Sequence, residues 1–495
     1  MLFNSQIFIF IFLPITLTGW FLLNHFKFYK LALWYLVGSS FWFYGYFNTS
    51  YLLILLSSIT VNYLVSFLME RNEKLETPLF IFGLAANIGL LGYYKYYDFF
   101  IDNINHVFRT DFALKHILLP LGISFFTLQQ ISFLIDRHWG TAEHYSLSEY
   151  FAYVTFFPQL IAGPIVLHNE IIPQFNDPEK RRFNKVNFRD GLILFILGLI
   201  KKVLIADTFA YMVNFGFEKI YYVDTPSAWI IALSYTFELY FDFSGYCDMA
   251  VGLGRMFNFE LPINFNSPYK SHSVPEYWNR WHATLTRFFT NYIYMPLTIK
   301  GVRKKKKKLY SVLAPMVVFF ISGFWHGASW TFVIWGITQG LATVWCQRKF
   351  LKTGKKLKPL AWITTFTFTV ITQAIFRSET MDNMVRILRG MFTLKYTGFM
   401  REVAESLKGD LLFKGLFSFI SPRVSFEAYY MIAFFVMVIL FAICTVILMG
   451  KNAHEILASQ QEKGYTFTFC AMLSLAFTWC LISLSQVSTF LYFNF

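Results

Sequence analysis

The sequence carries little charge for its length. Only 15% of its 495 residues are Asp, Glu, Lys or Arg, while 56% are hydrophobic. A soluble domain of this size needs more charge on its surface, so the composition argues against a soluble globular protein. Apolar runs recur from end to end and are continuous rather than alternating. This pattern predicts an all-α polytopic membrane protein and disfavours a β-barrel.

Cysteine is also scarce, and the few cysteines do not cluster. None forms a CxxC pair, and all lie within or beside apolar stretches, so we expect neither a disulfide framework nor a zinc site, and no metal. We interpret them as small buried residues. The five are Cys247, Cys346, Cys444, Cys470 and Cys480.

Internal repeats, low-complexity linkers and soluble-domain boundaries are absent as well. We therefore expect one membrane domain over residues 1–495, and the lack of a repeat argues against an inverted-repeat transporter. The first residues lack a basic n-region and a small-residue cleavage site, which favours a retained first span over a signal peptide. The candidate membrane segments are 5–24, 30–47, 51–69, 78–100, 117–136, 149–167, 190–213, 227–257, 310–324, 328–347, 360–376, 428–449 and 466–487.

Prolines and aromatic residues mark two of these segments. Pro158 and Pro164 interrupt segment 149–167, which predicts an incomplete or re-entrant helix, because lipid cannot replace a lost backbone donor. Tyr and Phe crowd the stretch NIGLLGYYKYYDFF (87–100). We expect an interfacial aromatic belt there.

Basic residues outnumber acidic ones, with a net charge of +14. They lie in short segments between apolar runs, as the positive-inside rule distributes them, so the partner they indicate is a lipid bilayer and not nucleic acid. The run RKKKKK (303–308) and the stretch 348–358 are expected to be cytosolic. We interpret the lysine run as a topological anchor, with binding of the phosphates of a soluble cofactor as the alternative.

The two basic stretches enclose a predicted hairpin, because segments 310–324 and 328–347 must enter the membrane and return. The first arm is short for a full span, which needs about 20 residues. We therefore expect His326, in SGFWHGASWTFVIWG (322–336), to lie at depth and to be reached from a cytosolic cavity. A neutral imidazole in such a cavity is a suitable general base for a hydroxyl or thiol attacking a thioester.

A second candidate histidine precedes the lysine run. Trp278, His282, Leu285 and Phe289 recur at i, i+4, i+7 spacing and predict one amphipathic helix at the cytosolic interface, with Arg280 on its other side. This helix is expected to direct His282 inward. A buried structural histidine is the alternative.

Charged residues also occur inside other apolar runs. A lysine pair at 201–202 indicates either a bent run or side chains that reach an interface or cavity, where an anionic ligand or simple snorkelling would explain them. Glu238, Asp242 and Asp248 predict either an internal ion-pair network or a cavity lining. His168 is expected to be structural or solvated.

Several motifs, in this order, resemble the membrane-bound O-acyltransferase family. They are NIGLLGYYKYYDFF, LPLGISFFTLQQISFLID, FFPQLIAGPI, GLIKKVLIAD, YFDFSGYCDMAVGLGRMF, NFNSPYKSHSVPEYWNRWHATLTRFF, FWHGASWTFVIWG and the terminal FLYFNF. The resemblance is to the bacterial branch typified by the membrane subunit of alginate O-acetylation. It implies a ring of about 11–13 transmembrane or re-entrant helices around a thinned centre, with funnels from both faces meeting near the catalytic histidine.

The resemblance also implies site residues. It carries the invariant catalytic histidine onto His326 and the second histidine onto His282. We expect the acyl donor to contact Trp325, Trp278, Arg280 and Lys202. Three positions depart from the family pattern, namely Gln339 where histidine is frequent, Glu238 where glutamine is common and Leu167 where a more polar residue is usual.

The implied reaction is polysaccharide O-acetylation at the bacterial cytoplasmic (inner) membrane. A cytosolic donor, acetyl-CoA, would deliver acetyl groups through the protein to an extracytoplasmic partner that resembles SGNH hydrolases. That partner would acetylate alginate, peptidoglycan or another surface glycan. Two alternatives stay open: D-alanyl transfer toward teichoic acid from a carrier-protein thioester, and a transporter or flippase without chemistry.

Overall fold

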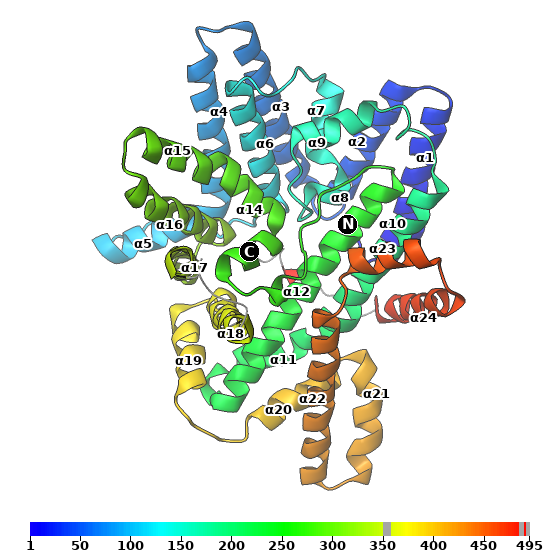
Figure 1. Cartoon of the computed structure of the whole chain (residues 1–495), viewed down its shortest axis with the longest axis vertical. Helices are drawn as coiled ribbons and strands as arrows, with labels where there is room; N and C mark the ends of the chain where they lie inside the picture. The colour runs from blue at the N-terminus through cyan, green and yellow to red at the C-terminus, as the bar shows by residue number, and fades with distance from the viewer. Residues whose placement is uncertain (350–357, 485–489, 492–495) are drawn as a thin grey trace.

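The computed structural model describes residues 1–349, 358–484 and 490–491, and the regular structure within these ranges is helical without strands. Figure 1 labels the helices in chain order. They are α1 (Leu13–His25), α2 (Tyr29–Gly45), α3 (Ser50–Arg71), α4 (Glu76–Leu91), α5 (Tyr97–Phe108), α6 (Ile123–His138), α7 (Leu147–Thr155), α8 (Phe157–Leu160), α9 (His168–Asn176), α10 (Lys185–Ile200), α11 (Asp207–Glu218), α12 (Thr225–Met256), α13 (Val274–Arg280), α14 (Ala283–Phe289), α15 (Met295–Arg303), α16 (Lys307–His326), α17 (Trp330–Lys349), α18 (Lys358–Arg377), α19 (Met381–Phe392), α20 (Met400–Glu405), α21 (Leu411–Ile420), α22 (Phe426–Met449), α23 (Ala453–Lys463) and α24 (Phe467–Ser483).

Six helical stretches in the described residues are long and apolar enough to cross a bilayer. This confirms the prediction of an all-α polytopic membrane protein. The six stretches correspond to the predicted segments 5–24, 51–69, 78–100, 310–324, 360–376 and 428–449. They are Phe8–His25, Ser50–Arg71, Glu76–Phe108, Lys307–His326, Lys358–Arg377 and Phe426–Met449.

Segment 149–167 is broken, as its prolines predicted. α7 ends at Thr155, α8 covers only Phe157–Leu160, and the chain to residue 167 is not helical. Protein takes up the freed backbone groups: the amide of Phe157 donates to Ser40 Oγ at 3.2 Å, and that of Ile165 to Thr284 Oγ1 at 3.0 Å. The irregular chain is tolerated because it is buried in protein and not in lipid.

The 32-residue helix α12 runs through the middle of the molecule (Figure 1) and is buried along most of its length. Glycines let α10 approach it closely. A Cβ added to Gly198 would lie 2.5 Å from the carbonyl oxygen of Gly245, and one added to Gly191 would lie 2.5 Å from that of Gly252. The two helices therefore pack backbone to backbone, as small residues permit between membrane helices.

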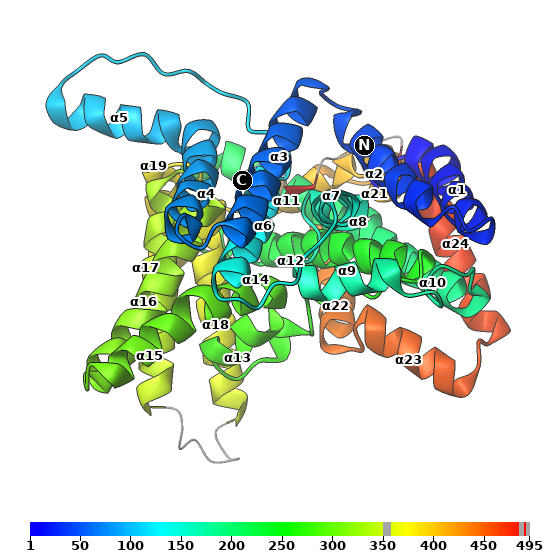
Figure 2. The ribbon, with the colours of Figure 1, turned by 90° about the horizontal axis from the view of Figure 1, so that it is seen from above.

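The predicted hairpin is formed by α16 and α17, whose backbones meet at Gly323 and Gly336. Figure 2 shows the open ends of the hairpin on the same side as α13 and α15. That side carries the basic residues 303–308, so the positive-inside rule predicts that it is cytosolic, and we call it the cytosolic side. The expectation of a short first arm was wrong, because α16 has 20 residues, enough to cross the hydrocarbon core.

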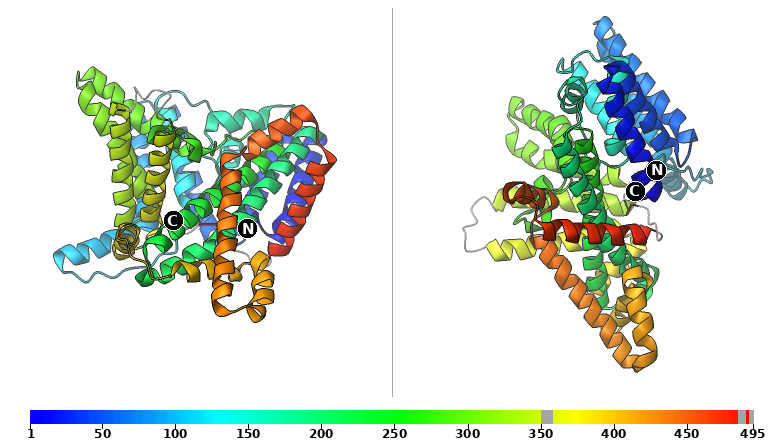
Figure 3. Two further views of the ribbon diagram at one scale, coloured as in Figure 1. Left: turned by 60° about the horizontal axis from the view of Figure 1, so that its bottom comes forward. Right: turned by 90° about the vertical axis from the view of Figure 1, so that its right-hand side faces the viewer.

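Residues 381–420 contain helices α19 to α21, which no predicted segment covered. Figure 3 shows α21 and α22 projecting together from the body of the molecule. α16 is long enough to cross the membrane, so a short helix does not explain why His326 at its end is enclosed. The packing of other elements around that end encloses His326.

Candidate functional site

His326 is the last residue of α16, and aromatic rings surround it. The ring centroids of Trp325, Trp335 and Phe376 lie 5.0, 5.3 and 5.1 Å from the centroid of its imidazole. Only 5% of its surface is exposed. His326 is therefore buried within the protein, and its depth in the membrane stays a prediction.

Two cavities reach this residue or its immediate neighbours. The smaller has a volume of about 30 Å³, and the imidazole of His326 forms part of its wall. Its other lining residues are Leu239, Tyr277, Trp278, Trp281, Trp335, Gln339, Thr369, Thr372, Gln373 and Phe376. The larger has a volume of about 710 Å³ and includes Gly327, the residue after His326, and the same Phe376.

The order of residues along α18 places the two cavities on either side of Phe376. Thr369, Thr372 and Gln373 line the small cavity, whereas Arg377 and the residues after it line the large one. Since α18 begins on the cytosolic side in Figure 2, the small cavity lies on the cytosolic side of Phe376 and the large one beyond it. Phe376 lines both cavities, whereas His326 lines the small one and its neighbour Gly327 lines the large one.

Lys95 and Tyr96 hold the end of α16 that carries His326. The Lys95 ammonium donates to the carbonyl oxygens of Trp325 at 2.6 Å and His326 at 3.0 Å, and the Tyr96 hydroxyl donates to that of Phe324 at 2.7 Å. These carbonyls at the helix end have no partner within the helix. A cation there also interacts favourably with the helix dipole.

The expected aromatic belt at 87–100 is therefore wrong for part of that stretch. Tyr96 is buried and Lys95 is half-buried, within the π-helical turn η2 (Gly92–Tyr96). Lys95 was not among the predicted site residues. The available signal was a lysine inside a stretch predicted to span the membrane, which is costly unless the residue has a role.

His282 lies at a break between two short helices and not within one continuous helix. α13 ends at Arg280, and His282 adopts a left-handed backbone (φ 46°) that begins α14. The prediction of one amphipathic helix was wrong, because contacts with Asn264 replace the helical ones. The inward direction was right, since His282 is 1% exposed.

Asn264 determines which nitrogen of His282 carries the proton. Its side-chain oxygen accepts from the backbone amide of Thr284 at 3.2 Å, so this atom is an acceptor. The same oxygen lies 3.1 Å from Nδ1 of His282, which must therefore donate. In the neutral ring the basic nitrogen is then Nε2.

The Trp325 ring contacts both histidines, with its centroid 6.4 Å from that of His282 and 5.0 Å from that of His326. Nearby, Trp278 Nε1 donates to Gln339 Oε1 at 3.2 Å, and Gln339 Nε2 donates to Thr372 Oγ1 at 2.9 Å. Gln339, noted as a departure from the family pattern, thus links three helices around the small cavity.

The other two residues expected to contact the donor, Arg280 and Lys202, lie in different parts of the protein. Arg280 pairs with Glu276 at 3.0 Å in α13, on the cytosolic side. Lys202 lines the large cavity and lies 2.6 Å from Asp242 and 2.8 Å from Asp207. Two carboxylates thus balance its charge, and its contact with the donor stays a prediction.

The lysine pair shows both features offered as alternatives. The run is distorted into a π-helix, η3 (Lys201–Ala206), and Lys202 lines the large cavity. Lys201 pairs with Asp248 at 2.6 Å. The ion-pair network is confirmed at Asp242 and Asp248, and the cavity lining at Glu238.

His168 was expected to be structural or solvated, and the structure shows the structural role. It is 1% exposed and contacts Tyr145 Oη at 2.9 Å and Asp136 Oδ2 at 3.0 Å. Within the described residues, no group of three His, Cys, Asp or Glu side chains is arranged to hold a metal ion.

Comparison with known proteins gives consistent matches. Residues 141–365 match the model of the membrane-bound O-acyltransferase family. The whole chain is 39% identical to 98% of a peptidoglycan O-acetyltransferase from Helicobacter pylori. The chain is also 35% identical to a probable alginate O-acetylase from Pseudomonas aeruginosa, in a match that covers 79% of this chain and 75% of that protein. It is 29% identical to a teichoic acid D-alanyltransferase from Streptococcus thermophilus, in a match that covers 48% of this chain and 61% of that protein.

Proposed function

Because the chain belongs to the membrane-bound O-acyltransferase family and is an O-acyltransferase, we propose that it moves acetyl groups from cytosolic acetyl-CoA across the bacterial inner membrane for O-acetylation of an envelope polysaccharide. The observation that carries this proposal is the position of His326, which lines the small cavity and is followed in the chain by Gly327, which lines the large one. A donor from one side and an acceptor from the other would meet at its imidazole.

The size of the small cavity supports a short acyl group. A volume of about 30 Å³ corresponds to roughly two water-sized spheres. An acetyl group has three heavy atoms beside the sulfur. A D-alanyl group is larger and carries a charged amine, for which the described lining of this cavity offers no carboxylate.

The proposed chemistry needs one base at the thioester. His326 accepts the proton of the acceptor hydroxyl as its oxygen attacks the thioester carbonyl carbon, the C–S bond breaks, and the proton passes to the leaving thiolate. The products are an O-acetyl ester and coenzyme A. The neutral ring of His282, with its proton on Nδ1, is proposed to assist at the same centre as the second histidine.

The donor is proposed to enter from the cytosolic side. Trp278 lines the small cavity, and Arg280 follows it in the same helix. Together with the basic run at 303–308, these residues would bind the adenine and phosphate groups of coenzyme A. Trp325 would pack against the acyl end of the donor.

The acceptor side is proposed to receive an SGNH-like partner. The large cavity is lined by charges of both signs, including Lys95, Lys202, Glu238, Arg377 and Glu379, as a polar ligand or a protein segment requires. Two of the relatives are named for acetylation of peptidoglycan and of alginate. We therefore propose a glycan of this kind as the final acceptor.

The test uses the protein in sealed vesicles with labelled acetyl-CoA inside, and the SGNH-like partner with peptidoglycan or alginate fragments outside. We expect base-labile label on the glycan only when donor, protein and partner are all present. Label derived from a D-alanyl carrier protein instead, or no use of acetyl-CoA with the partner present, would overturn the proposal.

A further inference from the structure

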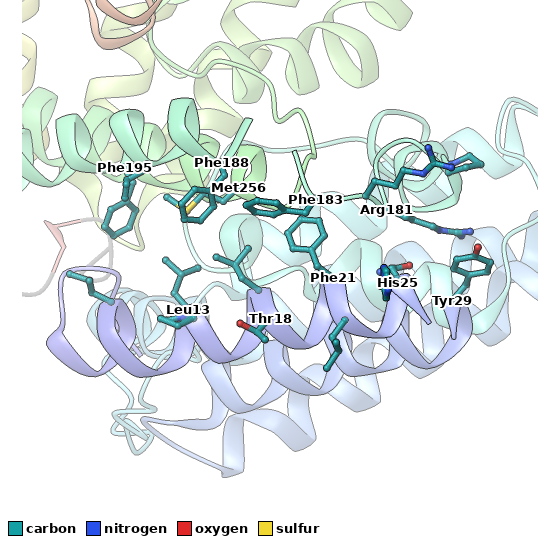
Figure 4. Close-up of a pocket in the computed structure, with 18 of the residues that line it drawn as sticks. Leu13, Thr18, Phe21, His25, Tyr29, Arg181, Phe183, Phe188, Phe195 and Met256 are labelled. Atoms are coloured by element: carbon teal, nitrogen blue, oxygen red, sulfur yellow. The ribbon is translucent and has the colours of Figure 1, made fainter. Parts of the chain in front are cut away.

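A second large cavity lies between α1 and α10, away from His326. Its volume is about 930 Å³, and Figure 4 shows it as a gap lined by side chains from both helices. Along most of its length the lining is apolar, with Leu13, Leu17, Phe21, Phe188 and Phe195 among the residues. None of the residues that line it also lines the small or the large cavity at His326.

One end of this cavity is basic. Figure 4 shows Arg181 near Tyr29 and His25, at the opposite end from Phe195. The Arg181 guanidinium lies 4.4 Å from the centroid of the Tyr29 ring, and its Nε donates to the carbonyl oxygen of Phe175 at 3.1 Å, which fixes its position. Lys27 and Arg182, close in sequence to Tyr29 and Arg181, also line the cavity.

Acidic residues do not balance this charge within the cavity wall. None of the lining residues is Asp or Glu. Outside the wall, Glu179 pairs with Arg182 at 3.6 Å, and both side chains are largely exposed. The loops that carry these cations, around residues 27–30 and 180–185, are among the basic segments of the chain and are therefore cytosolic. The basic end thus faces the membrane surface that is rich in anionic lipid.

The part of α1 that lines the cavity, from Leu13 to His25, is about as long as one leaflet is thick. α1 has 13 residues from Leu13 to His25, about 18 Å at 1.5 Å per residue. Half of a hydrocarbon core is about 15 Å. An acyl chain anchored by its headgroup at Arg181 would therefore end beside Leu13 and Phe195, near the middle of the bilayer.

From the apolar lining, the basic cytosolic end and the matching length, we propose that this cavity binds one anionic glycerophospholipid of the cytoplasmic leaflet. Its phosphate lies against Arg181, Arg182 and Lys27, and an acyl chain lies along α1. The lipid then fills the gap between the first helix and α10, and couples the N-terminal helices to the core. This proposal is independent of the reaction at His326.

The experiment measures lipid binding to the full-length protein in mild detergent by native mass spectrometry. The probes are phosphatidylglycerol with 16-carbon chains, phosphatidylcholine with the same chains, and glycerol 3-phosphate. We expect phosphatidylglycerol to bind at least tenfold more tightly than phosphatidylcholine. Glycerol 3-phosphate, which lacks chains, should not compete at equal concentration.

Variants separate the headgroup site from the chain site. Each cation near an anionic lipid surface contributes about 1 kcal/mol, so the double variant Arg181→Gln, Arg182→Gln should bind phosphatidylglycerol about 30-fold more weakly. Leu17→Trp should also weaken binding by filling the apolar part while leaving the cations in place. The matched control is Arg71→Gln, which removes a cytosolic cation outside the cavity and should leave binding unchanged.

Three outcomes would overturn the proposal. Equal binding of both phospholipids would remove the role of the basic end. Competition by glycerol 3-phosphate would make this a site for a soluble anion. An equal loss of phosphatidylglycerol binding in Arg71→Gln would show that general surface charge causes the effect. The melting temperature of each variant shows that it is folded, so a misfolded variant does not enter the comparison.

Discussion

Replacing Lys95 by Met should impair turnover without unfolding the protein. The substitution removes the hydrogen bonds of an ammonium group to the carbonyls of Trp325 at 2.6 Å and His326 at 3.0 Å, and a third to Ser124 Oγ at 3.3 Å. A hydrogen bond to a charged group contributes about 1.5–3 kcal/mol. If one such bond's free energy is lost from the positioning of His326, kcat should fall about 10- to 150-fold.

The assay is release of free thiol from acetyl-CoA by purified protein in detergent, with the SGNH-like partner added. We expect KM to change less than kcat, because Lys95 lines the large cavity and not the small one through which the donor is proposed to enter. The matched control is Lys115→Met. This variant removes an exposed lysine that packs on Tyr93 and Tyr97 beside the same segment but does not reach α16.

Two results would refute this reasoning. One is Lys95→Met protein with the melting temperature and kcat of the wild type. The other is an equal loss of kcat in Lys95→Met and Lys115→Met, which would show that the segment tolerates no change rather than that the ammonium holds the helix end.

Three further changes test other parts of the site. Gly336→Leu should lower the melting temperature by several degrees, because the new side chain would overlap the Phe319 carbonyl. Gly38→Leu, which has open space at its Cβ, should not lower it. Equal melting temperatures of the two variants would contradict the close packing of the hairpin. Asn264→Leu should lower the free energy of unfolding by about 1–3 kcal/mol, measured by thermal unfolding, because His282 Nδ1 and the Thr284 amide lose their buried acceptor. Unchanged stability and turnover would show that Asn264 does not hold the helix break at His282. Leu239→Ala should raise turnover of propionyl-CoA relative to acetyl-CoA by enlarging the small cavity, and an unchanged ratio would show that this cavity does not hold the acyl group.

The sequence allowed the hairpin and its histidine to be predicted because both depend on local signals. Basic stretches flank the two apolar arms, and His326 is the ionisable residue between them. The broken segment at Pro158 was predictable for the same reason, since proline acts on its own backbone.

Contacts between distant parts of the chain were not predictable. Lys95 contacts a carbonyl 230 residues away, and no periodicity in the stretch around it indicates that partner. The break at His282 depends on Asn264, 18 residues earlier, whose side chain competes with the helical hydrogen bonds. The helical pattern at 278–289 continues through the break, so the pattern alone predicts one helix.

The measurement that tests the central claim most directly is thiol release from acetyl-CoA by His326→Ala protein with the partner present. A general base contributes about 10²- to 10⁴-fold, so turnover should fall at least 100-fold while the melting temperature shows a folded protein. His168→Gln, which changes another buried histidine that lines neither cavity at the site, should keep most of the activity. Folded His326→Ala protein with wild-type turnover would contradict the account.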